Sequence, residues 1–126
     1  MKGAQPDQRV RRYQEKAVET PIERHLHGVT RRLAEALQPE RIVLFGSQAY
    51  GRPSPESDVD LLIVMNSDER PAARAARVSR LLRPRPFPID ALVRTPEEIK
   101  HRLEMGDQFI RMILERGRVL YERDVS

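Results

Sequence analysis

Two short apolar runs, joined by a loop rich in glycine, proline and serine, constrain the fold of this chain more than any other feature. The first run, residues 41–45 (RIVLF), stops at Gly46, and an unbroken apolar run of this length predicts a buried strand. The second, residues 58–64, alternates and is rich in branched side chains, which predicts another strand. Residues 46–57 contain two glycines, two prolines and three serines, so this segment is predicted to be turn and loop.

Helical patterns surround these strands. Residues 20–23 (TPIE) and 95–98 (TPEE) are capping boxes with proline at the first helical position. We therefore expect an α/β (α+β) fold in one domain over residues 20–126, with a small mixed β-sheet flanked by helices. The predicted helices are 20–37, 67–82 with Ser67 as N-cap, 96–105, and Asp107 to Gly117, and the predicted strands are 41–45, 58–64, 87–93 and an edge strand at 119–121.

Composition excludes several classes of protein. The 126 residues suit one domain, and the absence of cysteine excludes disulfides, thiolate metal sites and a thiol nucleophile. No apolar run is long enough to span a bilayer, and none at the N-terminus suits a signal peptide. A cytoplasmic protein without a membrane partner is therefore expected.

The net positive charge gathers near the N-terminus. Residues 1–32 contain eight basic and four acidic residues, an excess equal to the net charge of +4 for the whole chain. We interpret residues 1–19 as a basic leader, disordered or helical, in preference to a surface for nucleic acid. Aromatic residues make up only 5% of the chain and tryptophan is absent, which disfavours stacking on single-stranded nucleic acid. Nucleic acid is therefore not expected as a partner.

Three aspartates interrupt the predicted strands. Asp58 and Asp60 are two residues apart, so in a strand both side chains project from one face. Asp90 interrupts the third apolar strand and can join them if that strand lies beside the second. Carboxylates placed side by side are costly unless a cation lies between them, and oxygen-only ligands suit Mg²⁺ or Mn²⁺. Three carboxylates can hold two such ions about 3.5–4 Å apart for in-line displacement at phosphorus.

The glycine and serine that follow the first strand suggest a phosphate site. Gly46 allows the backbone to turn sharply and to approach a ligand closely. Ser47 would begin a short helix whose free N–H groups and hydroxyl face an anion. The segment is not a Walker motif, because Gly51 is followed by Arg52 and not by lysine with serine or threonine. The combination indicates phosphoryl or nucleotidyl transfer.

These motifs together resemble those of a known superfamily. Gly46-Ser47, ten intervening residues and Asp58-Val59-Asp60, with the distal Asp90, are similar to the signature of the DNA polymerase β-like nucleotidyltransferases. The span from about residue 22 to residue 121 resembles their stand-alone minimal members. The resemblance implies that Asp58, Asp60 and Asp90 are catalytic and bind two Mg²⁺ or Mn²⁺ ions with a nucleoside triphosphate. It further implies that Gly46 and Ser47 bind the β and γ phosphates, with additional contacts from Ser57 and Arg52.

The resemblance also implies a partner. Minimal nucleotidyltransferases are often paired with a small helical HEPN-domain toxin, and this chain is too short for a second domain that binds base and acceptor. We therefore expect transfer of AMP from ATP to a hydroxyl of such a partner, with the chain acting as antitoxin. A homo-oligomer is the other way to complete the site. The alternative function is a catalytically weak module that neutralises the toxin by masking it.

Other polar residues are interpreted as structural. His25, His27 and His101 fall in helical patterns away from the motif and are expected at the surface. Arg70, Arg74 and Arg77 form a helical stripe, interpreted as a solvated face in preference to a nucleic-acid surface. Tyr50, inside the loop, is expected to pack and not to stack on a base.

Overall fold

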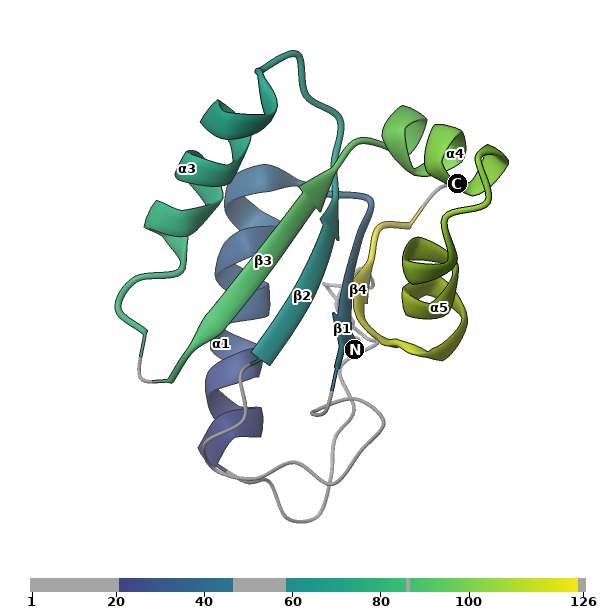
Figure 1. Ribbon diagram of the computed structural model, residues 1–126. Helices are drawn as coiled ribbons and strands as arrows, with labels where there is room; N and C mark the ends of the chain where they lie inside the picture. The colour runs from purple at the N-terminus through teal and green to yellow at the C-terminus, as the bar shows by residue number, and fades with distance from the viewer. Residues whose placement is uncertain (1–20, 47–58, 86, 125–126) are drawn as a thin grey trace.

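The sheet at the centre of the protein has helices on both of its faces (Figure 1). The structure, a computed structural model, describes residues 21–46, 59–85 and 87–124. Within these residues the sheet has four strands in the order β3-β2-β1-β4. In chain order they are β1 (Arg41–Phe45), β2 (Val59–Val64), β3 (Ile89–Arg94) and β4 (Arg118–Glu122).

The pairing of the strands fixes which strand ends meet. Strand β1 is antiparallel to both β2 and β4, whereas β2 and β3 are parallel. Parallel neighbours need a crossover, and the chain makes it through helix α3 (Pro71–Leu81). The end of β1 and the beginnings of β2 and β3 therefore lie at the same end of the sheet (Figure 1).

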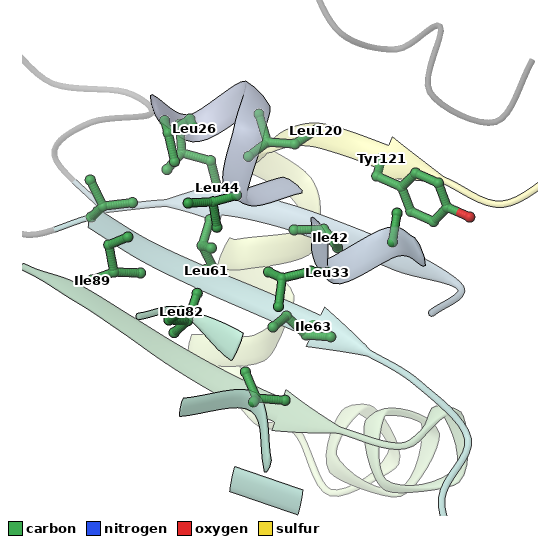
Figure 2. Packing of buried hydrophobic residues seen from close by; sticks show 14 of the residues in the cluster. Leu26, Leu33, Ile42, Leu44, Leu61, Ile63, Leu82, Ile89, Leu120 and Tyr121 are labelled. Atoms are coloured by element: carbon green, nitrogen blue, oxygen red, sulfur yellow. The ribbon is translucent and has the colours of Figure 1, made fainter. Parts of the chain in front are cut away.

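Alternate residues of each strand face different helices. Ile42 and Leu44 of β1 belong to the apolar cluster formed with α1 (Pro21–Leu37) and α3. Val43 and Phe45 belong to a second cluster formed with α4 (Pro96–Glu104) and α5 (Gln108–Arg116). Figure 2 shows the first cluster, whose labelled members are Leu26, Leu33, Ile42, Leu44, Leu61, Ile63, Leu82, Ile89, Leu120 and Tyr121.

Most of the helices and strands predicted from the sequence are confirmed. Thr95 forms the predicted capping box, in which its Oγ1 accepts from the N–H of Glu98 at 3.1 Å and its own N–H donates to Oε1 of Glu98 at 3.0 Å. Asp107 caps α5 by accepting from the N–H of Ile110 at 3.1 Å. The edge strand near residue 120 is also present, as β4 beside β1. None of the helices in the described part of the chain is long and apolar enough to cross a membrane.

The predicted start of α3 at Ser67 is wrong. The helix begins at Pro71, after Arg70 in extended conformation, and no side chain caps it. Proline lacks an N–H and its ring collides with the carbonyl four residues earlier, so Pro71 is tolerated only in the first turn of a helix. Ser67 instead accepts from the N–H of Glu69 at 3.0 Å in the segment before the helix.

The interpretation of the arginine stripe as a solvated face is wrong for its central member. Arg70 is exposed and Arg77 partly so, but Arg74 is only 2% exposed. Its two terminal nitrogens donate to the two carboxylate oxygens of Glu98 at 2.9 and 2.8 Å. The stripe pattern could not reveal this burial, because the partner carboxylate lies 24 residues away on α4.

Candidate active site

Asp60 is the second residue of β2 and lies on the sheet face that α4 and α5 cover. Its neighbours Val59 and Leu61 are fully buried on the opposite face, against α1 and α3. Because successive strand residues point to opposite faces, Asp60 shares its face with Leu62, a member of the α4/α5 cluster. Asp60 itself is only half-buried. The apolar face therefore ends in a carboxylate that solvent partly reaches.

Asp90 is the direct register partner of Asp60 in the parallel β2–β3 pair. Adjacent strands are about 4.8 Å apart, so the two carboxylates project side by side from one face of the sheet. Asp90 is exposed on β3, the strand at the end of the sheet order. The third strand thus lies beside the second, which was the condition for Asp90 to join Asp60. The assignment of these residues as metal ligands stays a prediction.

The donor atoms of this pair fit a hard divalent cation. Two like charges directly opposite each other across a sheet destabilise it unless a positive charge intervenes. Asp90 has no hydrogen-bonding or ionic partner among the residues that the structure describes. Those residues also contain no group of three acidic or histidine side chains suited to a metal, and the third predicted ligand, Asp58, lies outside them. Carboxylate oxygens are the donors that Mg²⁺ and Mn²⁺ prefer.

Gly46 is in close contact with the carboxylate of Asp60. Its φ of +82° is in the left-handed region that favours glycine, and a Cβ built on it would collide with Oδ2 of Asp60. Sequence reasoning assigned Gly46 to the approach of a phosphate, which stays a prediction. The structure adds a second reason for glycine, because any other residue would displace a candidate ligand.

Several predicted site residues lie outside the described residues, namely Ser47, Arg52, Ser57 and Asp58, together with Tyr50. Their assigned roles stay predictions. The described residues on either side of this stretch lie next to the aspartate pair, because Phe45 and Asp60 are register partners.

Phe45 and Phe109 form an aromatic pair that the sequence analysis did not identify. Phe45 is 9% exposed, and the ring of Phe109 meets it edge-on, with centroids 5.8 Å apart and an interplanar angle of 80°. Phe109 keeps 50% of its surface exposed. Because Phe45 pairs with Asp60, this aromatic pair adjoins the carboxylates. Apolar periodicity could place Phe109 in a helix, but it could not reveal a neighbour 64 positions earlier in the chain.

The histidines are at the surface, as predicted for His25 and His101, which are both exposed. The ring of His25 lies edge-on to Phe87, with centroids 5.7 Å apart. His27 is partly buried. All three lie on α1 or α4, outside the strands that carry the aspartates.

The match to a known family covers strands β1 to β3 and all but the last residue of β4. Residues 26–121 match the nucleotidyltransferase domain family, a span that includes Gly46, Asp60 and Asp90. The chain belongs to this family. The enzyme class predicted from the sequence, a nucleotidyltransferase, is thereby confirmed.

Two relatives of this nucleotidyltransferase agree with the assignment. Over 82 residues it is 37% identical to a protein of Methanocaldococcus jannaschii described as a candidate protein adenylyltransferase; the match covers 65% of this chain and 78% of that one. Its fold is similar to the crystal structure of a candidate nucleotidyltransferase from Sulfolobus solfataricus, with a TM-score of 0.52 and 25% identity. That match covers 62% of this chain and 70% of the other. The predicted fold class is confirmed.

Proposed function

We propose that this nucleotidyltransferase transfers AMP from ATP to a hydroxyl group on a protein partner, with Asp58, Asp60 and Asp90 holding Mg²⁺ or Mn²⁺. The observation that carries the proposal is the register pairing of Asp60 with Asp90 beside Gly46, in a chain of this family. The name of the M. jannaschii relative supports a protein as the acceptor.

The residues of this chain have distinct parts in that reaction. Asp60 is half-buried and lies next to Gly46, so it is suited to bind the metal ion that holds the triphosphate. Asp90 is exposed on the outer strand, so an acceptor hydroxyl can approach it from solvent. The hydroxyl oxygen forms a bond to the α-phosphorus, the bond to the pyrophosphate breaks, and the hydroxyl proton leaves through Asp90 to water. Divalent ions at these carboxylates would offset the charge of the phosphates and promote loss of that proton.

The partner that we propose is a small helical HEPN-domain toxin, with this chain as its antitoxin. The basis is the resemblance to minimal nucleotidyltransferases, together with the exposure of Asp90 on the edge strand β3. Modification of the toxin would then inactivate it covalently.

The test follows the mass of a candidate partner, the protein encoded by the neighbouring open reading frame. With the wild-type nucleotidyltransferase, ATP and Mg²⁺, its mass is expected to rise by one or more AMP groups. Asp90→Asn should abolish this addition and leave complex formation intact. Asp68→Asn, which removes the same charge from an exposed position, is the matched control and should modify the partner normally.

One outcome would favour masking over catalysis. If Asp90→Asn neutralised the toxin fully while the wild type added no AMP, catalysis would have to be abandoned as the function. The fold and the family would be unaffected.

A further inference from the structure

Two large apolar side chains are exposed in the described part of the chain, Met105 at 68% and Phe109 at 50%. They lie at the end of α4 and in the first turn of α5, on the side of the sheet that carries the carboxylates. A single exposed apolar residue needs no explanation. Phe109, however, also contacts the ring of Phe45, the register partner of Asp60.

Four neighbouring residues form a row across the sheet, which runs from Phe109 through Phe45 and Asp60 to Asp90. Phe109 meets the ring of Phe45, Phe45 is the register partner of Asp60, and Asp60 is the register partner of Asp90. Each step between strands is about 4.8 Å. Only the ribose separates the base of a nucleotide from its α-phosphate. A nucleotide with its phosphates at the aspartates can therefore place its base over Phe109.

The ring of Phe109 is held on a fixed support. Asp107 caps α5 through the N–H of Ile110 at 3.1 Å and is paired with Arg102 of α4 at 3.5 Å. Ile110 itself is buried against the sheet, at 3% exposure. A ring presented by a capped and anchored helix loses little freedom when a ligand stacks on it.

We propose that Phe109 is the base-stacking residue of the nucleotide site, with Phe45 holding its ring edge-on. This inference rests on the proposed nucleotidyl transfer and adds a subsite for the nucleobase. Stacking on an aromatic ring tolerates any base, so Phe109 contributes affinity for nucleotides as a class.

Tryptophan fluorescence tests the proposal directly, because the full chain contains no tryptophan. In Phe109→Trp the single indole should be quenched by ATP with Mg²⁺, and tripolyphosphate with Mg²⁺ should leave it unchanged. Met105→Trp is the matched control, because Met105 is also exposed and lies between α4 and α5. Its indole fluorescence should respond to neither ligand. Equal quenching by ATP and tripolyphosphate in Phe109→Trp would overturn the stacking assignment.

Affinity separates this inference from the proposed function. Phe109→Ala should weaken ATP binding roughly 10-fold without changing tripolyphosphate binding, and Phe109→Tyr should restore the ATP affinity. Unchanged ATP affinity in Phe109→Ala would remove the base subsite and leave nucleotidyl transfer standing. If the wild type bound neither ATP nor tripolyphosphate with Mg²⁺, both proposals would fall.

Discussion

Asp90 at the beginning of β3 and Glu98 just beyond its end are carboxylates in opposite situations. Both oxygens of Glu98 accept from Arg74, and one also accepts from the N–H of Thr95. Asp90 has no such partner within the described residues and pairs in register with another aspartate. The chain neutralises Glu98 with its own Arg74, which is typical of a structural ion pair. Asp90 has no comparable partner among the described residues, as is expected of a carboxylate that binds a metal ion.

The electrostatic consequence is visible at Glu98. The hydrogen bonds from Arg74 are the largest cause that lowers the pKa of Glu98 to about 2, partly opposed by burial and assisted by the Thr95 N–H. The same hydrogen bonds raise the pKa of Arg74. Both groups therefore stay ionised in the folded protein at neutral pH.

The largest expected effect distinguishes the two carboxylates by activity. Asp60→Asn or Asp90→Asn should reduce AMP transfer roughly 10³-fold, because lost metal binding removes several kcal/mol of transition-state stabilisation. Thermal stability of Asp90→Asn should stay the same or rise, since a like-charge pair is relieved. Glu98→Gln should do the reverse, lowering stability with turnover unchanged. Turnover assays and thermal melts of the three variants check this, and a loss of activity in Glu98→Gln alone would contradict the comparison.

Removal of the buried Arg74 guanidinium gives the next largest effect. Arg74→Met keeps much of the buried side-chain volume but removes the hydrogen bonds to Glu98, so the free energy of unfolding should fall by about 2 kcal/mol; the loss is smaller than for a fully buried pair because the Glu98 side chain is 37% exposed. Denaturant unfolding measures this loss. Arg70→Met, at an exposed position one turn earlier, is the control and should change stability by less than about 0.5 kcal/mol.

Gly46 and Gly106 offer a matched pair of substitutions. Both have a left-handed backbone, with φ of +82° and +83°, but a Cβ on Gly106 would meet nothing within 4 Å. Gly106→Ala should therefore cost only about 1 kcal/mol of stability and leave turnover intact. Gly46→Ala should cost about 2 kcal/mol and also reduce turnover, because the new methyl group displaces the Asp60 carboxylate. Equal turnover in the two variants would show that the contact with Asp60 is irrelevant to catalysis.

The smallest expected effect is a pH dependence of stability. The folded-state pKa of Glu98 is about 2, below its ordinary value of 4.5. Its contribution to stability is therefore complete above about pH 4.5 and is lost as the pH falls toward 2. The carboxylate is 37% exposed, so solvent screening keeps the contribution small. Unfolding curves of the wild type minus those of Glu98→Gln should show a difference that shrinks across this window; a constant difference would refute the ion pair's contribution.

Sequence reasoning reached most of the fold because local signals agreed. The capping box at Thr95, the aspartate cap at Asp107 and the apolar strands each act over a few residues, and periodicity reports them directly. It failed at α3, where Ser67 is a residue type typical of an N-cap but the helix begins at Pro71.

The candidate site was only partly accessible to sequence reasoning. The sequence allowed Asp90 to join Asp60 only on the condition that their strands are neighbours, which the structure meets. The burial of Arg74 and the contact between Phe45 and Phe109 depend on partners 24 and 64 positions away. Residue spacing carries no information about contacts of that kind.

The most direct test of the central claim is whether metal and nucleotide bind together at the aspartates. Thermal melts of the full chain with Mg²⁺, with ATP and with both should show a larger shift for the pair than for the two separately, because each completes the ligands of the other. The double variant Asp60→Asn and Asp90→Asn should lose this extra shift. The same extra shift in the double variant would contradict the assignment of these residues as metal ligands.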